Sequence, residues 1–267
     1  MTFETILVEK TGFTTIITLN RPGKLNALNA QMMGELTHVM VDLRQDTETR
    51  FVILRGAGKA FTAGADLSAR GAPSPPQTAG AEAQRSRLSQ LAAHDLIRAY
   101  ENLEQVTIAA VHGYCLGGGL VFAIASDFIL ATEDAVLGVP EANVGMFYSW
   151  GATARLNRLV GPLWTRQMVM TCQNITAAQA LSIGLVNQVV PNQKLMEAAW
   201  QLVDNIASKP TLAIRLTKKL VNAYSEPSRG DLFALESELM EYTNYTSAPA
   251  EGARAFREKR EPKFGAR

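Results

Sequence analysis

The feature that most constrains the fold is an alternation of short apolar strands and amphipathic helices. Residues 14–19 and 51–54 are β-branched or apolar runs of the kind found in buried strands. Between these two runs a helical pattern starts at Asn29, because apolar residues recur there at three- and four-residue spacing. Its apolar positions are Met32, Met33, Leu36, Val39, Met40 and Leu43.

The alternation then repeats. Residues 88–103 and 118–126 have helical patterns, and each is followed by a short apolar run, 107–111 and 128–131. Strands that alternate with helices in this way predict an α/β fold.

The character of the chain changes after Gly151. Helices are predicted over residues 152–159, 163–170, 177–183, 194–207, 212–223 and 231–245, with a single strand at 185–190. The last of these helices has an apolar face formed by Leu232, Leu235, Leu239 and Met240. Such a face packs either inside the subunit or against another one.

Bulk properties exclude several classes of partner. With a formal net charge of +1, the chain has no large field with which to attract nucleic acid. The longest apolar stretch, residues 116–125, is interrupted by glycines and is too short to span a bilayer. Cys115 and Cys172 stand alone, which favours a reducing compartment, and residues 1–10 lack a signal-peptide pattern. We therefore expect no membrane association and a cytoplasmic location.

Two glycine-rich segments follow predicted strands. They are residues 58–67, GKAFTAGADL, and residues 111–120, VHGYCLGGGL. Glycine lets a ligand approach the backbone closely, and the GGG run precedes a helix whose free N–H groups favour negative charge. The alternative is a tight turn in which glycine serves packing alone. Neither segment has the spacing of a dinucleotide-binding or P-loop motif, which disfavours a conventional nucleotide site.

The order of several motifs resembles the enoyl-CoA hydratase/isomerase (crotonase) superfamily over nearly the whole chain. These motifs are NRP at 20–22, LNAL at 25–28, KAF at 59–61, AGADL at 63–67, GY at 113–114, GGG at 117–119, PE at 140–141 with Gly145, Ala180, GLV at 184–186, VV at 189–190, EG at 251–252, AF at 255–256 and KR at 259–260. The resemblance implies an α/β core of repeated ββα units wound as a spiral. We expect residues 1–200 to form this core and residues 201–267 a helical region for oligomerisation and CoA contact.

The resemblance also implies the ligand and the assembly. The expected substrate is an acyl-CoA, with no cofactor besides the CoA that the substrate carries and no metal. His38, His94 and His112 show no metal-ligand spacing, and we expect His38 and His94 on helix surfaces. A homotrimer or a dimer of trimers is expected.

Site residues follow from the matching positions. The family's two oxyanion-hole N–H groups fall on Ala65 and Gly118, and Lys259 matches a basic residue that reaches CoA from a neighbouring subunit in some members. The expected substrate and CoA contacts are Lys24, Leu25, Ala63, Gly64, Ala65, Asp66, Leu67, Gly117, Gly118, Val121, Tyr148, Trp150 and Lys259. Asp66 is expected to brace the oxyanion loop rather than to take part in catalysis.

The sequence departs from the hydratase pattern at one position. Hydratases of this family hold water with two glutamates; the second is present as Glu141, but Val121 stands where the first would be. Val121 lies one helical turn after Gly118 on the same face and should point into the pocket. Apolar neighbours such as Val139 and Phe147 should raise the pKa of Glu141. By composition alone, Glu141 could equally be a surface glutamate at a helix start.

A single carboxyl group favours one mechanism. Moving a double bond needs one group that takes a proton and returns it, whereas hydration uses a base and an acid. The leading hypothesis is therefore an isomerase that abstracts a γ-proton from an enoyl-CoA and reprotonates the dienolate at the α-carbon. The alternatives are a hydratase or a thioester hydrolase, with Glu141 acting alone or with Tyr148 or Ser149, and an inactive CoA-binding protein.

The segment 148–150 allows two interpretations. Residues 148–150, Tyr-Ser-Trp, replace a stretch that is commonly small or proline-containing in hydratases. They either shape the acyl pocket, with Tyr148 as a hydrogen-bond donor, or form a packed aromatic corner.

Residues 70–83 contain prolines and glycines without periodicity, which predicts a surface loop of the kind that forms lids.

Overall fold

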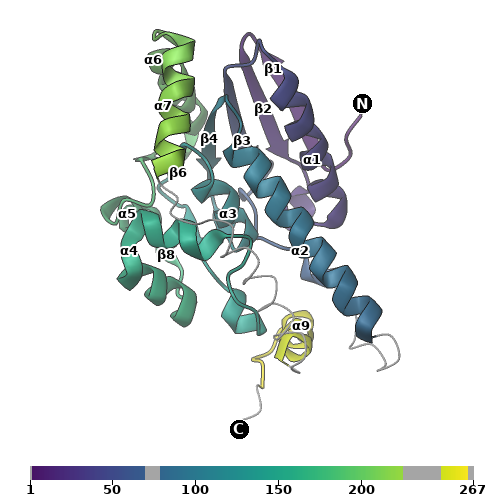
Figure 1. Ribbon diagram of the computed structural model, residues 1–267. Coiled ribbons are helices and arrows are strands. Elements are labelled where there is room, and N and C mark those ends of the chain that lie inside the picture. Colours follow the sequence, from purple (N-terminus) through teal and green to yellow (C-terminus); the bar gives the residue numbers. More distant parts are fainter. Residues whose placement is uncertain (1, 70–78, 225–247, 264–267) are drawn as a thin grey trace.

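The computed structural model describes residues 2–69, 79–224 and 248–263. Its centre is a six-stranded sheet with the order β1-β2-β3-β4-β6-β9 (Figure 1). The strands are β1 (Ile6–Thr11), β2 (Thr14–Leu19), β3 (Phe51–Gly56), β4 (Val106–Val111), β6 (Phe128–Thr132) and β9 (Gln188–Val190). The β1–β2 pair is antiparallel and the other pairs are parallel, so the carboxyl ends of the five strands β2, β3, β4, β6 and β9 lie at the same edge of the sheet.

A second, three-stranded sheet has the order β5-β7-β8. It consists of β5 (Tyr114–Leu116), β7 (Val136–Gly138) and β8 (Ile175–Thr176). Strand β5 follows β4 directly, so this sheet continues the chain from the carboxyl edge of the large sheet.

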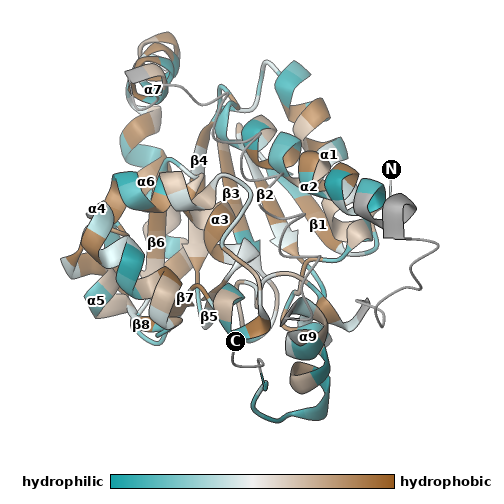
Figure 2. Ribbon diagram, turned by 60° about the horizontal axis from the view of Figure 1, so that its bottom comes forward, coloured by the Kyte–Doolittle hydropathy of each residue, from teal (hydrophilic) through white to brown (hydrophobic). Residues whose placement is uncertain are grey.

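Helices cover both faces of the large sheet. They are α1 (Ala30–Gln45), α2 (Ala79–Glu101), α3 (Gly118–Ile124), α4 (Ala152–Thr171), α5 (Ala177–Ser182), α6 (Leu195–Ala207), α7 (Thr211–Tyr224) and α9 (Ala248–Glu258), with short 3-10 turns η1 (Pro22–Lys24), η2 (Leu67–Ala69), η4 (Glu141–Val144) and η5 (Asn192–Lys194). The strands alternate between two cores: Ile17 and Val52 pack with α1, α2 and α3, whereas Ile16 and Ile53 pack with α6. Colouring by hydropathy shows the hydrophobic strands between these helices (Figure 2).

Local signals account for where the helices begin. Asn29 caps α1, because its side chain accepts a hydrogen bond from the Met32 N–H at 2.9 Å. The apolar spacing predicted for α1 is confirmed, with five of its residues buried: Met32, Leu36, Val39, Met40 and Leu43. Gly161 interrupts α4 with a positive φ of 74°, so the two predicted helices 152–159 and 163–170 are both present, on either side of that residue.

The α/β fold class is confirmed, but the sequence missed four strands. In β1 only Ile6 is buried, because it is an edge strand with little contact to the core, and β5, β7 and β8 are too short to show periodicity. Strand β9 covers only the end of the predicted 185–190 run.

Two other predictions need correction. Helix α2 begins at Ala79, so the predicted loop 70–83 is helical over its last five residues, and residues 70–78 lie outside the described part. His94 is buried rather than on a helix surface, because it precedes Ile97 by one turn on the inward face of α2. Burial lowers the pKa of His94 to about 4.

The predicted helix 231–245 lies outside the described residues, so its role in oligomerisation stays a prediction. Within the described ranges, none of the helices combines the length and the apolar character that crossing a bilayer requires.

Candidate active site

The two glycine-rich segments lie side by side at the carboxyl edge of the sheet. Strands β3 and β4 are parallel neighbours, so the turns that follow them leave the same edge. Three backbone hydrogen bonds join the turns: Phe61 N–H donates to His112 O at 2.7 Å, Thr62 N–H donates to Tyr114 O at 2.9 Å, and Leu116 N–H donates to Thr62 O at 3.1 Å. Ligands of open α/β sheets bind at this edge.

Gly64 makes the close contact between the two turns possible. Its φ is +88°, and a Cβ added there would lie 2.7 Å from Leu116 O and 3.4 Å from Gly118 N. A side chain would therefore force the turns apart. Leu28 fixes the other side of this turn, since its N–H donates to Gly64 O and its carbonyl accepts from Asp66 N–H.

Ala65 and Gly118 line one cavity of about 100 Å³. Among the described residues, neither backbone N–H has a hydrogen-bond acceptor. Both groups are thus available to an oxygen atom in the cavity, as an oxyanion hole requires. That the two N–H groups point at one atom stays a prediction.

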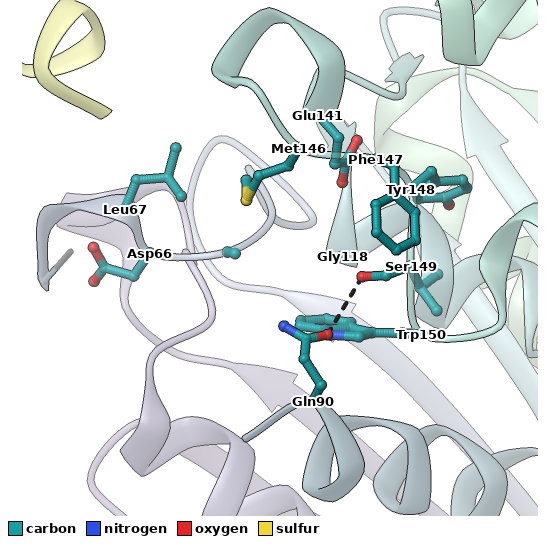
Figure 3. Close-up of a pocket in the computed structure, with 12 residues that line it drawn as sticks. Asp66, Leu67, Gln90, Gly118, Glu141, Met146, Phe147, Tyr148, Ser149 and Trp150 are labelled. Atoms are coloured by element: carbon teal, nitrogen blue, oxygen red, sulfur yellow. Dashed lines mark hydrogen bonds between the residues drawn. The ribbon is translucent and has the colours of Figure 1, made fainter. Parts of the chain in front are cut away.

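Further site residues predicted from the sequence line the same cavity. Figure 3 shows Glu141, Phe147 and Tyr148 on one side and Gln90 with Trp150 on the other. The described lining residues are Ala65, Asp66, Leu67, Gln90, Gly118, Val121, Glu141, Met146, Phe147, Tyr148, Ser149 and Trp150.

Glu141 is held in a mostly apolar setting. A Cβ added to Gly117 would lie 2.6 Å from Glu141 Oε1, so the carboxyl group rests against that glycine. Its other oxygen, Oε2, is buried and has no hydrogen-bond partner among the described residues. Loss of hydration raises the pKa of Glu141 to about 7, as predicted from its apolar neighbours. A carboxyl group with this pKa can both take up and release a proton near neutral pH.

Val121 is buried and lines the cavity, as predicted.

The other carboxyl group among the described lining residues belongs to Asp66, and its oxygen atoms already bind other side chains. Asp66 accepts a hydrogen bond from Ser68 and forms an ion pair with Arg21 at 2.9 Å. These partners hold the pKa of Asp66 below its usual value. In the structure Asp66 therefore braces the loop.

Arg21 and Asn26 tie the Lys24–Leu25 segment to this loop. The Asn26 amide donates to Ala57 O and Ala60 O, and Arg21 also donates to Ala27 O. Ala63 N–H donates to Leu25 O at 2.9 Å. Leu25 and Ala63 thus lie beside the cavity without lining it.

The basic residues predicted to meet CoA lie at the periphery. Lys24 and Lys259 are both exposed, and neither lines the cavity. Lys259 follows α9, which packs against η4 and η2. Contact of either lysine with CoA stays a prediction.

The aromatic segment 148–150 forms one wall. Tyr148 is buried, and the Trp150 ring covers Gly118, since a Cβ added there would lie 2.7 Å from Trp150 Cζ3. Trp150 has a φ of +59°, an uncommon conformation for a large side chain. Arg155 supports it by donating to Trp150 O at 3.1 Å, while Glu101 binds the same guanidinium.

Sequence reasoning missed Gln90 and Met146. The Trp150 Nε1–H donates to Gln90 Oε1 at 3.0 Å, and Ser149 Oγ donates to the same oxygen at 3.4 Å. The signal for Gln90 was present, because it precedes the buried Ala93 and His94 by three and four residues and so shares their helix face. Met146 had no comparable signal, since it follows a 3-10 turn in an irregular segment.

The fold and this cavity define an α/β protein of the enzyme type, in which a buried carboxyl group with a raised pKa and two backbone N–H groups line one cavity at the carboxyl edge of a sheet. The sequence profile described as Enoyl-CoA hydratase/isomerase matches residues 10–267, and the chain belongs to this family.

Individual relatives agree with this assignment. The chain is 36% identical over 261 residues to a short-chain-enoyl-CoA hydratase of Clostridium acetobutylicum, covering 97% of each protein. Among solved structures, an enoyl-CoA hydratase from Bacillus anthracis is 34% identical with a TM-score of 0.76, over 98% of this chain and 99% of that one. A methylmalonyl-CoA decarboxylase superposes with a TM-score of 0.84 at 25% identity over the full length of both chains.

Proposed function

We propose that this protein shifts the double bond of an enoyl-CoA, with Glu141 as the only proton-transferring side chain. The observation that carries the proposal is the Glu141 carboxyl group, whose pKa is about 7, in a cavity where Val121 occupies the expected place of a second carboxyl group. Double-bond migration needs one such group, because the proton that is removed is also the one returned.

The proposed mechanism uses the two backbone donors as follows. The thioester carbonyl oxygen accepts hydrogen bonds from the N–H groups of Ala65 and Gly118. Glu141 removes a proton from the carbon at one end of the allylic system, and negative charge moves to the carbonyl oxygen. The donors stabilise this dienolate because they are already in place. Glu141 then returns the proton at the other end, α or γ according to the direction of reaction, and the carbonyl is restored. No cofactor beyond the CoA of the substrate takes part.

The assignment is tested by supplying 2-enoyl-CoA and 3-enoyl-CoA of equal chain length and identifying the products. Interconversion of the two enoyl-CoAs is expected. Formation of 3-hydroxyacyl-CoA as the main product would replace isomerase by hydratase, and release of free CoA would indicate a hydrolase. Binding of both thioesters without any turnover would indicate a CoA-binding protein.

The pH profile of isomerisation should report the pKa of Glu141. The carboxylate is the active base in the free enzyme, so kcat/KM should be constant above pH 7 and fall about tenfold per pH unit below it. The measurement is kcat/KM for 3-enoyl-CoA between pH 5 and pH 9. A constant value down to pH 5 would contradict the proposed role of Glu141.

Hydration is the second candidate, because curated relatives at 36% identity are named enoyl-CoA hydratases. The two candidates differ in whether Glu141 alone can activate water. In the isomerase proposal, Val121→Glu should increase the hydration of crotonyl-CoA, because a carboxyl group one turn after Gly118 would face the water held by Glu141.

The Val121→Glu experiment measures the rate of crotonyl-CoA hydration, with Val121→Gln as the matched control of similar size. Two neighbouring carboxyl groups raise the pKa of one another, so one stays protonated and can act as the acid. Rapid hydration by the unmodified protein, with kcat/KM of about 10⁶ M⁻¹s⁻¹ or more, would favour the hydratase instead.

Self-association into a homotrimer or a dimer of trimers is proposed as well. Helix α7 supports it, because Leu212, Leu216 and Leu220 are more than half exposed on one side of that helix.

A further inference from the structure

Gln90 is a polar side chain in the cavity with no part in the proposed proton transfer. It comes from α2, on the opposite side of the cavity from Glu141 (Figure 3). Its Oε1 accepts hydrogen bonds from Trp150 Nε1–H and Ser149 Oγ. Since an indole N–H can only donate, the oxygen of the amide must be the atom that faces Trp150.

This orientation leaves the amide nitrogen without a partner in the part of the chain that the structure describes. Across the described residues, nothing accepts a hydrogen bond from Gln90 Nε2. Figure 3 shows this nitrogen on the side of the amide that faces Asp66 and Leu67, away from the indole. The site therefore presents two fixed N–H donors in addition to the backbone groups of Ala65 and Gly118.

The position of Gln90 indicates which part of a ligand these donors would meet. The six-membered ring of Trp150 lies over Gly118, while its ring nitrogen reaches Gln90. Gln90 is thus separated from the thioester carbonyl position by the width of an indole. A group on the acyl chain a few carbons beyond that carbonyl would come within its reach.

The surroundings select the chemistry of that group. Leu67, Val121, Met146, Phe147 and Trp150 give the cavity apolar walls. A plain hydrocarbon chain would remove water from the Gln90 amide without offering a hydrogen-bond acceptor, which is unfavourable for a polar group. A hydroxyl or carbonyl oxygen on the chain would satisfy it.

An anionic group is disfavoured. The described lining residues include no cation, whereas Asp66 and Glu141 both contribute carboxyl groups. Arg21 offsets the charge of Asp66, but a carboxylate on the ligand would meet no cation among the described lining residues and would be repelled by the Glu141 carboxylate. The cavity is also small, at about 100 Å³ against roughly 300 Å³ or more for typical ligand pockets, which favours a short acyl group.

We propose that Gln90 is a specificity-determining residue that selects short acyl-CoA substrates with a neutral hydroxyl or carbonyl oxygen a few carbons beyond the thioester. This inference rests on the proposed function, because it assumes that the acyl group of a CoA thioester enters the cavity. Ser149 and Trp150 contribute by fixing the orientation of the amide.

The test compares the binding of two CoA thioesters of nearly equal shape to the full-length protein by calorimetry. One is 4-oxopentanoyl-CoA, whose ketone oxygen can only accept a hydrogen bond, and the other is 4-methylpentanoyl-CoA, with a methyl group in place of that oxygen. The unmodified protein should bind the ketone about 10-fold more tightly, the effect of about one well-placed hydrogen bond. Succinyl-CoA, which has a carboxylate at the fourth carbon, should bind no more tightly than the methyl compound.

Two variants separate this role from a structural one. Gln90→Met cannot donate and should reduce the ketone preference to about onefold. Gln90→Glu keeps the oxygen that accepts from Trp150 and Ser149 but loses the donors, so it should reverse the preference. Gln84→Met, at an exposed position of the same helix, is the matched control and should retain the preference of the unmodified protein.

The possible failures are distinct. If the unmodified protein binds both thioesters equally, or Gln90→Met retains the preference, Gln90 serves only to hold Trp150 and the inference is wrong, while the proposed function stands. If neither thioester binds, the proposed function fails together with the inference.

Discussion

Replacing Glu141 by Gln should reduce double-bond isomerisation by at least ~10²- to 10⁴-fold, the range that a positioned proton-transfer group contributes. The amide fills the same space against Gly117 but cannot take up a proton. Because Ala65 and Gly118 are unchanged, the affinity for the acyl-CoA should be retained, and the loss should appear in kcat. Steady-state kinetics with 3-enoyl-CoA, together with calorimetric binding of a saturated acyl-CoA, measure the two effects.

The same substitution should make the folded protein more stable at alkaline pH. In the folded state the pKa of Glu141 is about 7, above its value of 4.5 in the unfolded chain. The unfolded state therefore releases this proton first, and stability falls as the pH rises from about 4.5 to 7. Glutamine removes that cost, so the free energy of unfolding at pH 8 should increase by ~1–3 kcal/mol.

Glu9→Gln, on the exposed face of β1, is the control for both measurements. It should change neither the rate nor the stability beyond about 0.5 kcal/mol. A Glu141→Gln variant that folds normally and still isomerises at the original rate would show that a different group transfers the proton.

Much of the fold follows from patterns that neighbouring residues set locally. The α1 helix has both its cap, Asn29, and its apolar stripe in the sequence, and β2 to β4 consist mainly of apolar or β-branched residues because both faces of the sheet are covered. Edge strand β1 and the short strands of the second sheet lack such patterns. They exist because other segments pair with them, which no local window records.

In the candidate site, too, some features follow from local sequence patterns and others depend on contacts between distant segments. The two glycine-rich turns could be expected to meet, since they follow neighbouring predicted strands, and the apolar surroundings of Glu141 could be expected from Val121, Val139 and Phe147. The hydrogen bond between Gln90 and Trp150 joins α2 to a segment 60 residues later in the chain. Nothing in either segment alone predicts that contact, because it depends on how α2 crosses the cavity.

His94 illustrates the opposite error. As a polar residue in a helix it was expected at the surface, yet its place one turn before Ile97 puts it on the buried face. Helical spacing predicts its burial better than its polarity does, because the position of a residue around the helix decides whether its side chain faces the core. Burial then lowers the pKa of the imidazole.

The second large effect is expected from Gly64→Ala, a change of one methyl group outside the cavity lining. The added Cβ would lie 2.7 Å from Leu116 O, and the φ of +88° is unfavourable for alanine. Relief of this contact must separate the two turns, which moves the Ala65 N–H away from Gly118. Loss of one oxyanion donor typically costs ~10²- to 10³-fold in kcat, so isomerisation should fall by about that factor.

The control is Gly34→Ala on α1, where an added Cβ meets no atom within 4 Å. It should leave the rate unchanged and increase stability by about 0.5–1 kcal/mol, because alanine favours the helix over glycine. Measuring kcat for both variants, with thermal unfolding to show that each is folded, separates damage to the site from loss of structure. If Gly64→Ala folds and keeps its full kcat, the charge that develops on the thioester oxygen is stabilised elsewhere. The Ala65 and Gly118 N–H groups would then lose their proposed role, since a backbone contact at 2.7 Å requires a shift in the segments that directly precede or contain these two groups.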